Sequence, residues 1–180
     1  MPEDPAASAD AEVVAEPAIA PDIQAEVARL HLSARRVGYL LSLLSLVTFG
    51  LGVYSLTYPD HLTRIVAIAL VGISGSTCGA VTSCLARYAT GIALDSGQRL
   101  PANVEGEVFD RRMELSFLLR PLLGAIIAPL AIWASGMLAT SHTELLNSTE
   151  AVVLIAFFAG LYAKAILIAS KNLFKAVFRA

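Results

Sequence analysis

Residues 65–86 read IVAIALVGISGSTCGAVTSCLA, a stretch of 22 residues without a charged side chain. An α-helix rises about 1.5 Å per residue, so about 20 apolar residues cross a hydrocarbon core of roughly 30 Å. A segment in lipid must satisfy its own backbone hydrogen bonds, and a helix does so. The stretch is therefore predicted to be a transmembrane helix.

Three other runs have a similar length and character, at residues 37–58, 115–138 and 151–170. The last two contain one base each, Arg120 and Lys164. The chain of 180 residues is 56% hydrophobic and 16% charged, and its mean hydropathy of +0.67 is too high for an ordinary soluble domain. The predicted fold is an all-α, integral membrane four-helix bundle over residues 37–180.

The positive charges outside these runs predict the orientation, because Lys and Arg accumulate in cytoplasmic segments. Ten bases lie before the first span, between the second and third spans, and after the fourth: Arg29, Arg35, Arg36, Arg87, Arg99, Arg111, Arg112, Lys171, Lys175 and Arg179. The other two connections, residues 59–64 and 139–150, contain one base, Arg64. Both termini of this multi-pass protein are therefore predicted to be cytoplasmic.

The net charge of -2 conceals a split along the chain. Residues 1–26 hold seven acids and no base, so residues 27–180 hold 13 bases against 15 - 7 = 8 acids, or +5. Residues 1–21 consist mostly of Ala, Pro and acids, which cannot bury enough apolar surface to offset the entropy of ordering. They are predicted to be a disordered acidic tail.

Residues 22–36 are predicted to form an amphipathic juxtamembrane helix. Asp22 is a suitable N-cap, and apolar residues follow it at helical spacing. These are Ile23, Val27, Leu30 and Ala34. The helix either lies on the inner membrane surface or runs directly into the first span.

The longest connection, residues 87–114, lies on the cytoplasmic side in this topology. Residues 95–98, Asp-Ser-Gly-Gln, are typical of a turn, and Pro101 blocks an uninterrupted helix. Residues 105–114 are charged and are expected to form a helix that leads into the third span.

Small residues gather on one face of the second span, and a polar stripe lies on the first. The small face includes Gly72, Gly75, Ser76 and Gly79, and the stripe includes Ser42, Ser45 and Thr48. Small residues let helix backbones approach closely in lipid, where little hydrophobic force acts between helices. These faces are expected to pack the two spans as an antiparallel hairpin. The alternative is that they form a subunit contact or line a pore.

Two bases lie within the spans, and an intramembrane charge is by default a functional hypothesis. Both Arg120 and Lys164 are near the inner side, where long basic side chains can extend to the headgroups. Gly160, Lys164, Lys171 and Lys175 would share one face of a continuous helix. Such a basic stripe could bind anionic headgroups, line the vestibule of an anion pore or dock the acidic tail.

Two prolines, Pro121 and Pro129, fall in the third span. Pro121 follows Arg120 near the first turns of the helix, where a missing N–H costs few hydrogen bonds. Pro129 is in the interior and is predicted to kink the helix.

The sequence contains no motif for catalysis or cofactor binding, so we expect no enzyme activity, no cofactor and no nucleic-acid partner. Cys78 and Cys84 are interpreted as small packing residues. The two outer connections contain metal-ligand types, Asp60, His61, His142 and Glu144. Four such residues in short loops are common by chance, and we expect no metal.

The motif LLRPLLGA at residues 118–125, followed by FFAGL at residues 157–161, resembles uncharacterised small bacterial four-helix inner-membrane proteins. In these proteins, one helix starts with Arg-Pro-x-x-Gly-Ala and precedes a last helix rich in Ala and Gly. The likeness covers about residues 65–175. It implies a bacterial inner (plasma) membrane and carries no activity.

Two functions are expected from these features. The first is a non-enzymatic membrane module for anchoring, sensing or interaction, with a cytoplasmic protein partner. The second is a homo-oligomeric ion channel or pore that depolarises the membrane. Both involve a bilayer with anionic headgroups, and self-association is expected.

Overall fold

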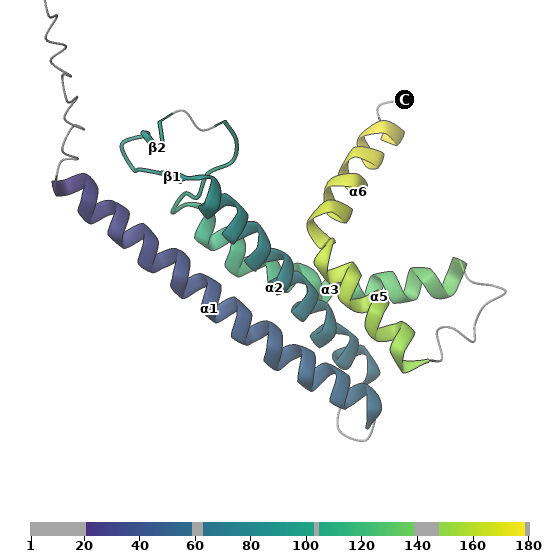
Figure 1. The fold of residues 1–180 in the computed structure, drawn as a ribbon. Coiled ribbons are helices and arrows are strands. Elements are labelled where there is room, and N and C mark those ends of the chain that lie inside the picture. The colour runs from purple at the N-terminus through teal and green to yellow at the C-terminus, as the bar shows by residue number, and fades with distance from the viewer. Residues whose placement is uncertain (1–20, 59–62, 103–104, 139–147, 179–180) are drawn as a thin grey trace, which may run out of the picture.

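The computed structural model describes residues 21–58, 63–102, 105–138 and 148–178. Five helices and a two-stranded hairpin make up these residues (Figure 1). The predicted acidic tail, apart from Pro21, lies outside the described residues. Three of the helices are long and apolar enough to cross a membrane, and a bent pair of helices would be a fourth span.

The first helix, α1 (Pro21–Thr57), joins the predicted juxtamembrane helix and the first span. Its 37 residues extend for about 55 Å, longer than a hydrocarbon core. Of the two arrangements expected for residues 22–36, the structure therefore shows the direct continuation into the span. Buried side chains recur along α1 at intervals of three or four residues: Leu30, Ala34, Val37 and Leu41.

The central helix is α2 (Arg64–Thr90), which contacts α1, α3 and α5. It lies antiparallel beside α1 along most of its length, as predicted from the short connection between them (Figure 1). Gly52 of α1 makes the close approach possible, because a Cβ there would lie 2.7 Å from a methyl carbon of Val71.

The long connection between the second and third predicted spans folds into a small hairpin. Strands β1 (Ile92–Ala93) and β2 (Arg99–Leu100) are antiparallel, with Ile92 opposite Leu100. The predicted turn at residues 95–98 is confirmed, and its Gly97 adopts a φ of +82°, which favours glycine.

The expectation of a helix over residues 105–114 is wrong, because the helix begins only at Met113. Phe109 instead runs beside β1, exchanging hydrogen bonds of 2.9 Å with Gly91 and Ala93. Its ring is fully buried in a cluster with Leu30 and Ala34 of α1. An aromatic residue in a short charged segment gains more from this burial than from helix formation.

The hairpin is fastened to the first half of α1 by polar contacts as well. The backbone N–H of Asp95, in the turn of the hairpin, donates to Glu26 over 2.5 Å. The Ser33 hydroxyl donates to Glu114 and so joins α1 to the first turn of α3. We use the name cap for β1, β2 and the segment around Phe109 that runs beside β1, together with the part of α1 around Leu30 and Ala34 that they cover. The end of the molecule that carries it is the capped end.

The third span is confirmed as one helix, α3 (Met113–Leu138). Pro121 and Pro129 both lie within it, and neither interrupts it. Pro121 is buried, and Trp133 near the far end is 63% exposed, as an interfacial anchor would be.

The predicted fourth span over residues 151–170 is not one straight helix. Helix α5 (Thr149–Leu161) begins at the N-cap Ser148, and α6 (Ala163–Phe178) follows after a bend of 69° at Tyr162. Alone, α5 extends for about 20 Å, which is shorter than a hydrocarbon core. Figure 1 shows α6 leaving the other helices at an angle.

Two properties of the sequence favour this bend. Gly160 weakens the helix near the break, since glycine is about 1 kcal/mol less favourable than alanine in a helix interior. Beyond the break, Lys164, Lys171 and Lys175 share one face of α6, opposite apolar residues. Such an amphipathic helix is stabilised along a membrane surface rather than across the core.

Candidate functional site

The small-residue face of α2 is used for packing within one chain. A Cβ on Gly72 would lie 2.4 Å from the carbonyl oxygen of Gly124, and a Cβ on Gly75 would lie 2.0 Å from that of Phe157. Gly79 meets Leu161 in the same way, at 2.9 Å. The backbone of α2 therefore contacts both α3 and α5 directly. Since the predicted face is filled by these helices, it does not line an open channel.

The three residues of the polar stripe on α1 differ in what they contact. The Ser45 hydroxyl donates to the Ser74 carbonyl oxygen over 3.1 Å, and the Thr48 hydroxyl is buried and bonded to Leu44 of its own helix. Ser42 is exposed. Only part of the stripe thus joins the two spans.

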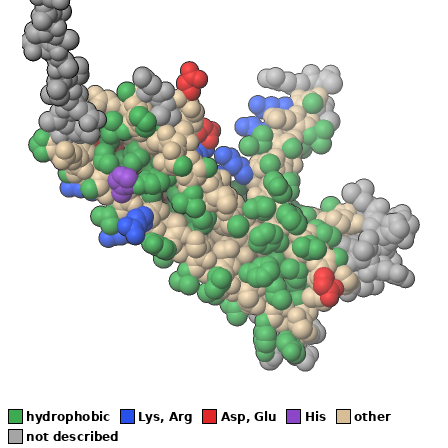
Figure 2. Space-filling model, in the orientation of Figure 1, with side chains coloured by type: hydrophobic (Ala, Val, Ile, Leu, Met, Phe, Trp, Pro, Cys, Tyr) green, Lys and Arg blue, Asp and Glu red, His purple; other side chains and the backbone are tan. Residues whose placement is uncertain are grey.

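Ser42 and Ser45 line an apolar groove of about 560 Å³ between α1, α2 and α5. Ser74 and Cys78 contribute its other small side chains. Its walls are aliphatic and aromatic: Leu46, Phe49, Val81, Val153, Leu154, Phe157 and Phe158. Exposed apolar side chains cover much of the helices on the face seen in Figure 2.

A second cavity, of about 550 Å³, opens near the capped end between α2, α3 and α6. We call it the basic cleft. Three bases line it, namely Arg87 from α2, Arg120 from α3 and Lys164 from α6. Glu107 is its acidic residue, so the formal charge of the lining is 3 - 1 = +2. Its remaining walls are neutral: Gly79, Ser83, Ala86, Thr90, Leu161, Tyr162, Ala165 and Ile168.

Arg120 is held in place by neutral groups of α2. Its Nη1 donates to the carbonyl oxygen of Gly79 over 3.0 Å and to the Ser83 hydroxyl over 2.8 Å. The guanidinium carbon lies 5.0 Å from the centre of the Phe117 ring, a cation–π contact. Its Nε is buried and has no acceptor among the described residues.

The backbone around Arg120 is also tied to α2. The Ser76 hydroxyl donates to the Arg120 carbonyl oxygen over 2.6 Å, and Gly124 permits contact with Gly72 one turn later. The Arg-Pro-x-x-Gly-Ala motif therefore has a geometric role here. Its arginine enters the cleft, and its glycine lets α3 approach α2.

Arg87 lies in the last turn of α2 and forms an ion pair with Glu107. A further N–H of Arg87 donates to the Met113 sulfur at the start of α3. The side chain of Arg87 is 11% exposed and that of Glu107 is 75% exposed. The pair joins the cap to the edge of the basic cleft.

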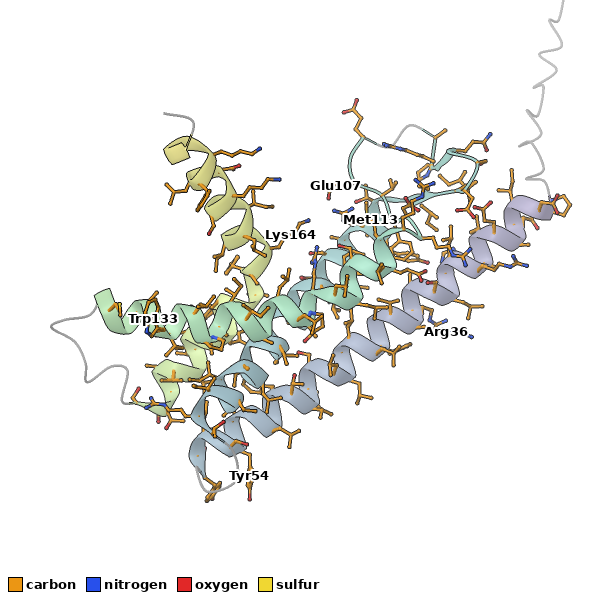
Figure 3. The ribbon with its side chains drawn as sticks, turned by 180° about the vertical axis from the view of Figure 1, so that it is seen from behind. Arg36, Tyr54, Glu107, Met113, Trp133 and Lys164 are labelled. Carbon is orange, nitrogen blue, oxygen red and sulfur yellow. The ribbon has the colours of Figure 1, made fainter. Side chains whose placement is uncertain are left out.

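The bend at Tyr162 divides the basic stripe predicted from the sequence. Gly160 belongs to α5 and is packed against Gly72, whereas the three lysines belong to α6. Of these, Lys164 lines the cleft, and Lys171 and Lys175 lie exposed further along the helix. In Figure 3 the side chain of Lys164 points from α6 toward the region of Glu107.

Sequence reasoning selects Arg120 and Lys164 but misses Arg87, Glu107 and Ser83 as their neighbours. For Ser83, the signal is its position two helical turns after Ser76 on the same face of the second span. No pattern in the sequence indicates that Arg87 and Glu107 would lie beside Arg120. In the described residues, no three His, Cys, Asp or Glu side chains are grouped so as to hold a metal ion. Asp60, His61, His142 and Glu144 lie outside the described residues. Cys78 and Cys84 are free thiols.

Comparison of the chain with family models, curated proteins and solved structures gives no match.

Proposed function

We propose that this chain is a non-enzymatic, multi-pass protein of a bacterial inner membrane, with its capped end in the cytoplasm, and that it serves as an anchoring or interaction module. The distribution of bases supports this orientation. Arg29, Arg35, Arg36, Arg87, Arg99, Arg111 and Arg112 all belong to segments at the capped end, whereas Arg64 begins α2 at the opposite end. Positive charges of this kind favour the cytoplasmic side.

The basic cleft is the observation that carries the proposal. It gathers two arginines, a lysine and the Ser83 hydroxyl that is bonded to Arg120, at the end of the helices that would meet the inner headgroups. These groups are suited to holding an anion, because each donates hydrogen bonds and three are cationic. The cap beside the cleft offers an ordered surface for a cytoplasmic protein partner.

A homo-oligomeric channel is the alternative. The apolar groove favours it, because the polar side chains of Ser42, Ser45 and Ser74 lie on a side of the molecule that α3 does not cover. Association of several copies through this side would bring Ser42 and Ser45 of the copies together, whereas Ser74 is buried within one chain. The packing of the small face of α2 within one chain favours the module instead.

Ion flux from liposomes containing the purified chain distinguishes the two functions, with the oligomeric state measured in parallel. We expect silent liposomes. A steady ion flux, abolished by substitution of Ser45, would establish the channel instead. A reporter fused after Ala180 tests the orientation separately, and activity of the reporter only outside the cytoplasm would reverse it.

A further inference from the structure

We propose that the basic cleft binds the phosphate group of an anionic phospholipid from the inner leaflet. This inference rests on the proposed function in one respect, since it requires the capped end to lie at the inner face. It names the ligand that the module would hold and the residues that recognise it.

The first step is the unbalanced charge of the cleft. Glu107 neutralises Arg87 by a direct ion pair. Arg120 is bonded to a carbonyl and a hydroxyl oxygen, which are neutral acceptors. Within the described residues, neither Arg120 nor Lys164 forms an ion pair with a carboxylate. Among the described residues, two cationic groups therefore face one cavity without a counter-charge in contact. Arg120 is partly buried, so water screens its charge less than at an open surface.

The second step is the chemistry that matches these donors. Guanidinium and ammonium groups pair readily with phosphate oxygens, and the bonds are charge-assisted. A phosphodiester has two non-bridging oxygens that share one negative charge, so Arg120 and Lys164 could each contact one. The Ser83 hydroxyl, already bonded to Arg120, would hold the guanidinium in place.

The third step identifies a lipid rather than a free ion. Leu161, Ala165 and Ile168 form an apolar wall in the same cleft as the three bases. Glycerol and the first methylene groups of a lipid would cover this wall, whereas a hydrated phosphate ion would leave it against water. Arg120 lies seven residues after Met113, about 10 Å into α3, near the boundary between headgroups and acyl chains.

Glu107 acts as an internal competitor in this arrangement. Its carboxylate is largely exposed, and exposed ion pairs contribute only about 0–1 kcal/mol. A lipid phosphate in the cleft would compete with Glu107 for Arg87. Removal of the carboxylate charge should therefore strengthen lipid binding.

The test uses the full chain in detergent and counts retained lipid by native mass spectrometry. Phosphatidylglycerol should be retained in preference to phosphatidylcholine. Lys164→Gln should weaken retention of phosphatidylglycerol about fivefold, the effect of one base near an anionic lipid. Glu107→Gln should strengthen it. Lys164 is exposed, so its replacement should not unfold the chain.

Lys175→Gln is the matched control, because it removes the same charge from the same helix outside the cleft. Equal losses in the Lys164 and Lys175 variants, or equal retention of the two lipids, would overturn the proposed site. Complete displacement of the lipid by excess inorganic phosphate would show that the ligand is a free anion. Ion flux combined with selective lipid retention would overturn the module but keep the site, whereas silent liposomes without lipid selectivity would overturn the site alone.

Discussion

The hydroxyl of Ser76 donates a 2.6 Å hydrogen bond to the carbonyl oxygen of Arg120, across the contact between α2 and α3. One turn further along α2, the Gly79 carbonyl oxygen accepts from the Arg120 side chain. The backbone and the side chain of the same arginine are thus both bound to α2. Arg120 therefore enters the basic cleft from a fixed position, and among the described residues no carboxylate forms an ion pair with it.

Removal of the Ser76 hydroxyl should loosen this contact. Hydrogen bonds between transmembrane helices contribute about 0.6 kcal/mol on average and up to about 1.7 kcal/mol. We expect Ser76→Ala to lower the free energy of unfolding by an amount in this range, measured by denaturant titration in mixed micelles. Thr82→Ala is the control, since within the part of the chain that the structure describes the Thr82 hydroxyl bonds only to its own helix, at Cys78 and Gly79. An equal loss in both variants would contradict the role assigned to Ser76.

The contact at Gly72 should not tolerate even a methyl group. A Cβ there would lie 2.3 Å from the Cβ of Ala128 and 2.4 Å from the carbonyl oxygen of Gly124. We expect Gly72→Ala to destabilise the chain by about 1–3 kcal/mol, the usual range for overpacking, with a lower melting temperature in detergent.

Gly50→Ala provides the comparison for Gly72→Ala. Gly50 is also in a helix, but a Cβ added there would meet nothing within 4 Å. Its replacement should leave stability unchanged or raise it by up to about 1 kcal/mol through helix propensity. Melting of both variants at the wild-type temperature would contradict the close packing of α2 against α3 at Gly72.

The cap should depend on Phe109. This ring is fully buried between β1 and α1, and truncation of a buried Phe to Ala costs about 3–5 kcal/mol. We expect Phe109→Ala to speed hydrogen exchange at Ala93, whose N–H donates to the Phe109 carbonyl oxygen. Amides in the middle of α2 should keep their protection. Leu154→Ala, a change at an exposed apolar position, is the control and should leave exchange in the cap unaltered.

The sequence is sufficient to predict the first three spans, because long apolar runs have few alternatives in a membrane. It also predicts that Gly72 and Gly79 serve close packing. The partners Gly124 and Phe157 could not be predicted, since small residues on one helix face indicate close packing but do not identify the helix that packs there. The selection of those partners depends on how three helices cross.

Neither the cap nor the bend at Tyr162 could be predicted from the sequence, for different reasons. Phe109 is buried against the part of α1 that extends beyond the first span. The apolar spacing of residues 22–36 fits a helix on the membrane surface as well as a helix continuous with the span, so the sequence alone does not predict this contact. The bend has no proline to indicate it. A straight span over residues 151–170 would put Lys164 about 9 Å inside its inner end, whereas the structure places it at the start of α6 beside the basic cleft.

The angle of α6 gives the last prediction, which compares spin labels at Ile166 and Leu173. Both positions are exposed and lie seven residues apart on α6. In a straight span, they would differ in membrane depth by about 10 Å. With the bend of 69°, and α5 close to the membrane normal, the difference falls to roughly 4 Å, because only the component of the helical rise along the normal remains.

Power-saturation EPR in liposomes measures these depths on single-cysteine variants, with Cys78 and Cys84 replaced in all of them. Leu115 and Leu122 calibrate the measurement, since they are exposed and seven residues apart on the unbroken helix α3. The α6 pair should show less than half of the depth difference of the α3 pair. Equal differences in the two pairs would mean that α6 continues the fourth span. In that case Lys164 would lie inside the membrane without the cleft that α6 forms with Arg87 and Arg120.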